Sequence, residues 1–154
     1  MNLGDLIKPE AVIANLRARN KKALLTEIAD LAAGQLKLNQ ANVFEALWQR
    51  EMLSSTGLGR GIAIPHARIP QVAAMYGLFG KLEHPLDFGA VDDKPVDLVF
   101  LLLAPEHAGA DHLRALARVS RLMRDASSLD RLRGSKSRSA IYAVLTEPST
   151  SNAA

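Results

Sequence analysis

One histidine of this chain, His66, ends a segment whose glycines and proline give the backbone an unusual course. The segment runs from Ser54 to Arg68 and reads Ser-Ser-Thr-Gly-Leu-Gly-Arg-Gly-Ile-Ala-Ile-Pro-His-Ala-Arg. Glycine permits tight turns and close backbone approach, and Pro65 fixes its own φ angle directly before the histidine. Such a segment is expected to be an exposed loop that presents a single imidazole in a defined pose.

A presented imidazole can act as a base, bind a metal ion or attack an electrophile such as a phosphoryl group. The chain has no cysteine and no His-Glu-x-x-His motif, so neither a metal site nor another cofactor is expected. The absence of a G-x-S-x-G motif counts against a hydrolase that uses His66 as a base, and no P-loop is present. Nucleophilic phosphoryl transfer needs the least beyond one histidine and nearby cations. The alternative is a histidine in a buried turn, with its ring satisfied by backbone groups.

A second histidine, His112, is predicted to lie in the first turn of an amphipathic helix over residues 111–125. Unpaired backbone N–H groups and the helix dipole favour an anion at that position. If this helix starts beside His66, a phosphoryl group on His66 would meet both the helix N-terminus and the ring of His112. The two histidines are therefore candidates for one phosphate site.

Three further residues are candidates for contacts with that phosphate. Arg50 falls in the last turn of a predicted helix over residues 40–51, and its guanidinium offers a planar fork of donors suited to phosphate oxygens. A surface arginine favoured by the helix dipole is the alternative reading of Arg50. Thr56 and Ser55 are expected to add hydroxyl donors.

Hydrophobic spacing predicts alternating helices and strands along the chain. Strands are expected at residues 10–16, 73–79 and 96–103, and helices at 21–34, 40–51, 111–125, 128–133 and 138–145. Asn20 and Gly34 are the expected caps of the first helix, and residues 84–89 are expected to form a connector or a short edge pairing. The pattern predicts one three-layer α/β domain over residues 1–147, with a mixed, mainly parallel sheet flanked by helices. Residues 148–154 are expected to be a disordered tail.

Arg50-Glu51 and the run from Ser55 to His66 resemble the phosphorylation-site segment of the fructose/mannitol-type EIIA domains of the bacterial phosphotransferase system, most closely in its nitrogen-regulatory branch. The resemblance extends over residues 6–145 and includes the stretches 23–36, 94–104 and 112–116. It implies that His66 is the phosphorylated histidine, through Nε2, that His112 is a second active-site histidine and that Arg50 supports them. On physical grounds, a backbone carbonyl holding Nδ1–H would leave Nε2 nucleophilic.

The resemblance implies a phosphocarrier and regulatory protein that accepts a phosphoryl group from a small HPr-like phosphocarrier protein. Its phosphorylation state would control binding to regulatory targets such as a transporter or a sensor kinase. The alternatives are a sugar-specific EIIA that relays phosphate to a permease-linked EIIB, and a non-phosphorylated interaction module of the same fold. A docking surface is expected from an apolar rim and two flanking cations: Leu58, Ile62, Ile64, Arg60 and Arg68.

Charge is distributed unevenly along the chain, whose formal net charge is +3. Residues 112–139 hold eight Lys/Arg and two Asp/Glu, a balance of +6, whereas the remainder balances at −3. Four arginines in this region share helical spacing: Arg114, Arg118, Arg121 and Arg124. We interpret them as a solvated helix face, with a docking surface for an acidic partner as the alternative.

Other partners and compartments can be weighed from composition. Nucleic acid is not expected as a partner, because the basic region has no aromatic residue to stack on bases. No apolar run approaches ~20 residues, and the N-terminus lacks the layout of a signal peptide. A cytoplasmic protein that is not embedded in a membrane is therefore expected, and the lack of cysteine fits a reducing compartment.

Overall fold

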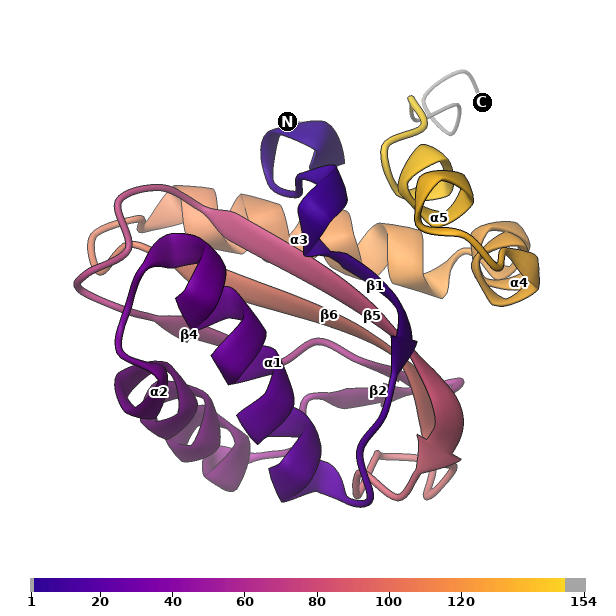
Figure 1. Ribbon diagram of the computed structural model, residues 1–154, viewed down its shortest axis with the longest axis horizontal. Helices are drawn as coiled ribbons and strands as arrows, with labels where there is room; N and C mark the ends of the chain where they lie inside the picture. The colour runs from indigo at the N-terminus through magenta and orange to yellow at the C-terminus, as the bar shows by residue number, and fades with distance from the viewer. Residues whose placement is uncertain (1, 149–154) are drawn as a thin grey trace.

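A mixed sheet forms the middle layer of the structure, a computed structural model that describes residues 2–148 (Figure 1). Within this range the sheet has six strands in the order β1-β5-β6-β3-β2, with β4 also pairing with β6. The strands are β1 (Val12–Leu16), β2 (Gly57–Gly59), β3 (Ile62–Ala63), β4 (His66–Arg68), β5 (Tyr76–Leu86) and β6 (Val96–Ala104). The pairs β1–β5, β3–β6 and β4–β6 are parallel, whereas β2–β3 and β5–β6 are antiparallel. This arrangement confirms the predicted mixed, mainly parallel sheet.

Strand β6 is the centre of the fold. It pairs with β5 along one edge and with β3 and β4 along the other. Its sequence is apolar at almost every position, and all of its residues except Asp97 are buried. A strand that is covered on both faces requires such a continuous apolar run, so the prediction of a buried central strand is confirmed.

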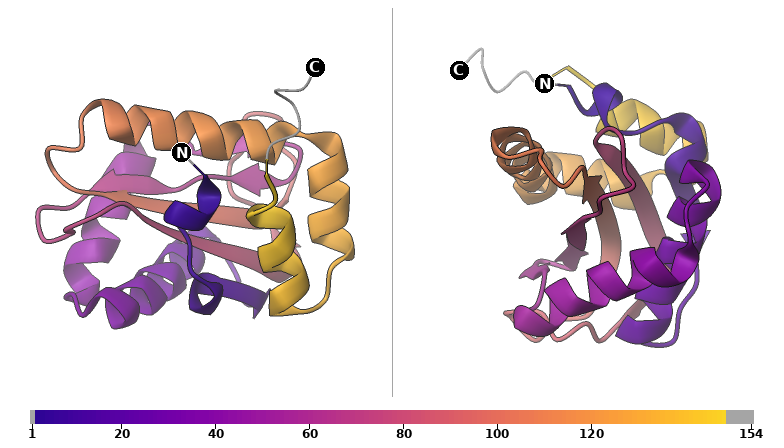
Figure 2. Two further views of the ribbon diagram at one scale, coloured as in Figure 1. Left: turned by 90° about the horizontal axis from the view of Figure 1, so that it is seen from above. Right: turned by 90° about the vertical axis from the view of Figure 1, so that its left-hand side faces the viewer.

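Five α-helices within residues 2–148 cover the two faces of the sheet, and two short 3-10 helices lie at Leu3–Asp5 and Pro9–Ala11. The α-helices are α1 (Lys21–Leu36), α2 (Gln40–Leu53), α3 (Ala110–Arg124), α4 (Ala126–Gly134) and α5 (Arg138–Leu145). Helices α1 and α2 pack side by side on one face, and α3 lies across the opposite face (Figure 2). The fold thus has the three layers that the sequence predicts.

Side-chain caps explain where several helices begin. The Asn20 side chain accepts a hydrogen bond from the backbone N–H of Ala23, as predicted, and Asn39 caps α2 in the same way. The predicted C-terminal cap of α1 is wrong: Gly34 lies inside the helix. Lys37 instead adopts the left-handed conformation, with φ 58°, that ends it.

The sequence prediction also missed parts of the sheet. Strand β5 continues through residues 84–86, where a connector or short edge pairing was expected, and Leu86 still pairs with Val96. The ladder is irregular between Lys81 and Leu86, and such an irregularity accommodates Pro85, which cannot donate a backbone hydrogen bond. The predicted tail lies outside the described residues except for Pro148, so the domain boundary at residue 147 stays a prediction.

Candidate active site

Strand β4 determines where His66 lies. His66 and Arg68 occupy alternate positions of this short strand, so both project from one face, while Ala67 is buried on the other. The N–H of Leu102 donates to the carbonyl of Pro65, which joins the segment to β6. The expectation of an exposed loop is therefore wrong: His66 opens a strand and is half-buried.

Hydrogen bonds fix the protonation of the His66 ring. Its Nδ1 lies 2.9 Å from the carbonyl oxygen of Ile64, which can accept but not donate. Its Nε2 lies 3.2 Å from Nε of Arg50, which can donate but not accept. The neutral ring thus carries its proton on Nδ1 and its lone pair on Nε2. Burial, assisted by the charge of Arg50, lowers the pKa of His66 below 6.5, although the Ile64 hydrogen bond and Glu51 oppose this shift.

His112 lies in the first turn of α3 and faces His66. The two ring centroids are 5.7 Å apart, with an angle of 71° between the ring planes. Its Nδ1 accepts a hydrogen bond of 3.0 Å from Nε of Arg68, so the proton of the neutral ring is on Nε2. Burial first, and then the neighbouring His66 and Arg68, lower the pKa of His112 below 6.5. Both rings are consequently neutral at pH 7.

The Nε2 atom of His112 is buried and has no hydrogen-bond partner among residues 2–148. A buried donor without a partner destabilises a fold by about 1–3 kcal/mol, and such groups are rare in native structures. This N–H is therefore a strong candidate for a contact with a ligand between the two rings.

Arg50 reaches His66 from the last turn of α2. Its Nη1 donates to the carbonyl oxygen of Ser54 at 3.0 Å, while its Nε faces the imidazole. The carbonyl groups at a helix C-terminus lack partners within the helix, and Arg50 satisfies one just beyond it. The guanidinium is thus held at the end of α2 and beside Nε2 of His66.

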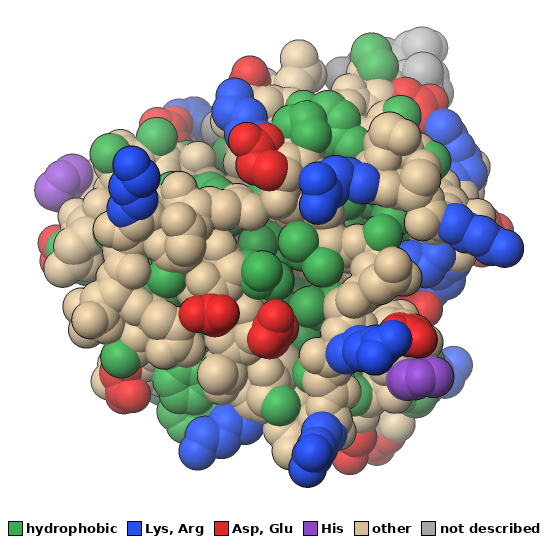
Figure 3. All heavy atoms as spheres, in the orientation of Figure 1, with side chains coloured by type: hydrophobic (Ala, Val, Ile, Leu, Met, Phe, Trp, Pro, Cys, Tyr) green, Lys and Arg blue, Asp and Glu red, His purple; other side chains and the backbone are tan. Residues whose placement is uncertain are grey.

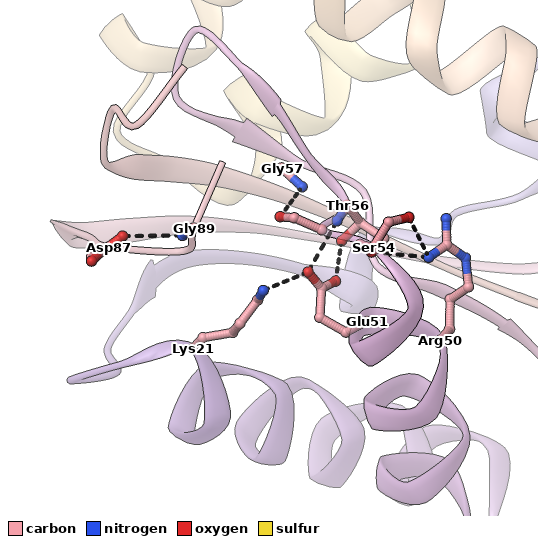
Figure 4. A network of polar contacts seen from close by, with 9 residues as sticks. Lys21, Arg50, Glu51, Ser54, Thr56, Gly57, Asp87 and Gly89 are labelled. Atoms are coloured by element: carbon pink, nitrogen blue, oxygen red, sulfur yellow. Dashed lines mark hydrogen bonds and ion pairs between the residues drawn. The ribbon is translucent and has the colours of Figure 1, made fainter. Parts of the chain in front are cut away.

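A buried polar network supports this end of α2 (Figure 4). Glu51 lies next to Arg50 in the chain but points into the protein, where its carboxylate accepts from the backbone N–H of Thr56 at 3.0 Å and from its hydroxyl at 2.5 Å. The ammonium group of Lys21, at the start of α1, forms an ion pair with Glu51 at 2.6 Å. Glu51 therefore links α1, α2 and the segment that leads into β2.

The network also changes the expected role of Thr56. A hydroxyl has one hydrogen to donate, and the Thr56 hydroxyl donates it to the buried carboxylate of Glu51. The expectation that Thr56 offers a hydroxyl donor to phosphate is not met in this structure, because that carboxylate takes the hydrogen. Ser55 accepts from the N–H of Gly57 at 3.1 Å through its hydroxyl oxygen, and its role toward phosphate stays a prediction.

Two of the three residues of the expected apolar rim are buried, whereas Leu58 is 38% exposed. Ile62 and Ile64 are 1% and 4% exposed, because they belong to the inner part of the sheet. On the two helices that carry Arg50 and His112, the large exposed apolar side chains are Met52, Leu53 and Leu113, which are 56%, 81% and 66% exposed. Leu53 ends the helix that carries Arg50, and Leu113 follows His112 in α3.

Arg60 is also far from the site. It lies in the turn between β2 and β3 with φ 59°, its N–H donates to Asp92, and its side chain donates to the carbonyl of Arg124. Arg124 is twelve residues along α3 from His112, about 18 Å at the rise of a helix. The expectation that Arg60 adds charge beside His66 is therefore wrong.

The sequence interpretation did not link Arg68 to His112 and did not foresee the ion pair of Glu51 with Lys21. Arg68 was noted as a nearby charge, and its position two residues after His66 would have placed both side chains on one face had β4 been predicted. The pair of Glu51 with Lys21 has no comparable signal, since 30 residues separate them. The structure brings together His66, His112 and Arg50 as predicted, and adds Arg68.

Known proteins share this fold and are similar in sequence. The family model described as "Phosphoenolpyruvate-dependent sugar phosphotransferase system, EIIA 2" matches residues 5–147. The chain therefore belongs to this EIIA family, as the sequence resemblance indicated. None of the helices within residues 2–148 is long and apolar enough to cross a bilayer.

Relatives in this family carry two kinds of name. The nitrogen regulatory protein of Bradyrhizobium diazoefficiens is 50% identical over 148 residues, which cover 96% of this chain and 97% of that protein. The crystal structure of the nitrogen regulatory protein IIA-Ntr from Neisseria meningitidis matches with a TM-score of 0.89 and 36% identity, over 94% of this chain and 99% of that one. The fructose-specific EIIABC component of Bacillus subtilis is 32% identical over 96% of this chain, but over 23% of its own length.

Proposed function

We propose that the protein is a regulatory phosphocarrier, which accepts a phosphoryl group on Nε2 of His66 from a small HPr-like phosphocarrier protein. The observation that carries this proposal is the state of the His66 ring. The Ile64 carbonyl holds the proton on Nδ1, burial keeps the ring neutral, and the Nε2 lone pair points toward a cation. A neutral imidazole with a directed lone pair is the form that acts as a nucleophile.

The proposed step needs no proton transfer at His66. The Nε2 lone pair attacks the phosphorus of the donor and forms an N–P bond. The bond between phosphorus and the leaving atom of the donor breaks, and the leaving atom keeps its electron pair. The Nδ1 proton stays on the ring, where the Ile64 carbonyl stabilises the positive charge that develops there.

Arg50 and His112 would take different parts in this step. Arg50 donates to the same Nε2 that must attack, so its guanidinium has to turn toward the incoming phosphate oxygens, for which its planar fork is suited. The free Nε2–H of His112 is already unpartnered and would donate to an oxygen of the phosphoryl group. Both groups stabilise charge on the transferred group without forming a bond to phosphorus.

Incubation with a phosphoenolpyruvate-driven phosphate chain tests the assignment. We expect wild type to gain one acid-labile phosphoryl group by intact mass, and His66→Gln to gain none. His107→Gln, which removes an exposed loop histidine, is the matched control and should behave as wild type. An undiminished adduct on His66→Gln would contradict the choice of nucleophile, and no adduct on wild type would favour a non-phosphorylated interaction module.

Phosphorylation would also act as a binding switch. A phosphoryl group adds about −1.5 to −2 charges at neutral pH. The helices that carry Arg50 and His112 also carry Leu53 and Leu113, whose exposed side chains suit contact with an apolar partner surface. Burying a dianion in such a contact is costly. We therefore expect regulatory targets to bind the unmodified protein and to release the phosphorylated one, with calorimetry on both forms as the measurement.

A relay to an EIIB partner is the second candidate function, favoured by the likeness to the fructose-specific EIIABC component. In that case the phosphorylated protein should lose its label to a purified EIIB domain within seconds. Persistence of the label in the presence of EIIB, together with different target affinities of the two forms, would favour regulation.

A further inference from the structure

Arg68 donates a hydrogen bond to His112 but has no part in the proposed phosphoryl transfer as described above. We propose that Arg68 is a positioning residue, which holds His112 in the tautomer whose Nε2–H faces the phosphoryl position beside His66. This inference rests on the proposed function, because the role of Arg68 is defined by the phosphoryl group that His66 is proposed to carry. Arg68 acts through His112, and no contact with the phosphoryl group is assigned to it.

The geometry leaves one tautomer open to His112. The Arg68 guanidinium remains protonated at any working pH, and its Nε lies 3.0 Å from Nδ1. A proton on Nδ1 would point at another proton, so Nδ1 must accept and the ring proton must reside on Nε2. That Nε2 is the buried donor without a partner, on a ring 5.7 Å from the ring of His66.

If Arg68 served to stabilise the fold, we would expect its side chain to pair with a carboxylate. Arg133, which does have such a role, donates two hydrogen bonds to the carboxylate of Asp97. Within residues 2–148, Arg68 forms no ion pair with a carboxylate, and its side-chain hydrogen bond is to His112. Its charge also disfavours protonation of that ring. The contact thus keeps His112 a neutral donor with a defined direction.

Loss of this contact should change the state of His112 in a measurable way. In Arg68→Met the proton can occupy either ring nitrogen, so a mixture of tautomers is expected. The like charge that opposes protonation is also gone, so the pKa of His112 should rise. In Arg68→Lys an ammonium group can still donate to Nδ1, so the wild-type tautomer should be largely restored.

Long-range ¹H–¹⁵N NMR on the full-length, unphosphorylated chain measures these states directly. In wild type we expect Nδ1 of His112 to show the shift of an unprotonated nitrogen and Nε2 that of a protonated one. Arg68→Met should show averaged shifts. Arg114→Met is the control, because it removes a charge from the next turn of α3 that pairs with Asp111 rather than with a histidine. Unchanged His112 shifts and an unchanged pKa in Arg68→Met overturn the positioning role.

A second readout connects the tautomer to the phosphoryl group. One hydrogen bond contributes about 1 kcal/mol, so phosphohistidine 66 should hydrolyse about fivefold faster in Arg68→Met, with rescue in Arg68→Lys. Equal hydrolysis rates in wild type and Arg68→Met would also overturn the role. A wild-type protein that takes up no phosphoryl group would instead overturn the proposed function, a result independent of the tautomer measured on the unmodified chain.

Discussion

Arginines lie near both ends of α3, and their partners differ. At the first turn of α3, Arg68 donates to the ring of His112, and Arg50 donates to the ring of His66. Beyond the last turn, Arg133 donates two hydrogen bonds to the carboxylate of Asp97 at 2.8 and 2.9 Å, and another to the carbonyl of Arg60. The first group meets neutral rings, whereas Arg133 meets an opposite charge.

This difference indicates that the two ends of α3 have different roles. At the far end the charge of Arg133 is compensated, and a side chain at Gly61 would collide with the ion pair, since a Cβ there would lie 2.6 Å from Arg133 and 2.7 Å from Asp97. This ion pair connects β6, which carries Asp97, with α4, which carries Arg133. At the site end, the positive charge of two guanidinium groups has no carboxylate within ion-pair distance among residues 2–148, which leaves it available to an anion.

In Figure 3, Lys and Arg side chains gather toward the side of the molecule where α4 and α5 lie. Of the predicted arginine stripe, Arg114 pairs with Asp111, whereas Arg118, Arg121 and Arg124 line a hollow between α3, α4 and the end of α5. The exposure of Arg114, Arg121 and Arg124 agrees with a solvated helix face.

The largest expected effect on stability concerns the buried ion pair below the site. Glu51→Met should lower the free energy of unfolding by about 3 kcal/mol, because Lys21 and the N–H of Thr56 would lose their buried partner. Urea denaturation measures it. Glu45→Met, which changes an exposed glutamate of the same helix, should stay within about 0.5 kcal/mol. An equal effect of the two substitutions would show that the network does not support the site end.

A smaller effect on stability is expected when one arginine at each end of α3 is replaced. Arg133→Met removes charge-assisted bonds from a partly buried pair and should cost about 1–2 kcal/mol of stability, whereas Arg68→Met should cost less than about 0.5 kcal/mol. For phosphoryl transfer the ranking should reverse. Arg131→Met, at a more exposed ion pair, is the control for general charge loss. If Arg68→Met were the more destabilising change, the site arginine would be structural.

Much of the fold could be predicted because hydrophobic spacing is a local signal. The continuous apolar run of β6 and the amphipathic pattern of α3 are legible without knowledge of their neighbours. Strands β2, β3 and β4 have two or three residues each, too few for a period to be read. They depend on non-local pairing, since β3 and β4 pair with β6 and β2 pairs with β3. The errors on the His66 environment and on the apolar rim follow from missing these strands.

Within the site, predictability depended on what the residue contacts. The proximity of His66, His112 and Arg50 could be predicted because the chain carries a recognisable segment and a helix start at suitable positions. The hydrogen bond from the Thr56 hydroxyl to Glu51 could not be predicted, because nothing local in the sequence shows that the Glu51 carboxylate is buried. The link of Arg68 to His112 spans 44 residues and depends on the register of β4 against β6.

A still smaller effect is expected from pH. The folded pKa values of His66 and His112 are lowered by burial, so the unfolded chain takes up protons near pH 6.5 while the folded chain does not. Stability should therefore fall as pH decreases below about 6.5 toward the folded pKa values, by less than about 1.4 kcal/mol per pH unit for each histidine. Chemical denaturation at pH 7.5, 6.5 and 5.5 measures this, and His112→Asn should flatten the profile. A steeper profile in His112→Asn would contradict a lowered pKa.

The smallest effect is expected at the exposed arginines of the far end. Arg121→Met together with Arg124→Met should change stability by less than about 0.5 kcal/mol, because both side chains are exposed and the contact of Arg124 with Arg60 uses its backbone carbonyl. The rate of phosphorylation should also be unchanged, since these residues lie about 15 Å along α3 from His112. A slower rate of phosphorylation in the double variant, with no further decrease at higher salt concentration, would show that the donor protein docks on this face through its acidic groups. In that case the C-terminal end of α3 would bind the donor protein. It would then be wrong to assign a functional role to the His112 end alone and a structural role to the Arg133 end.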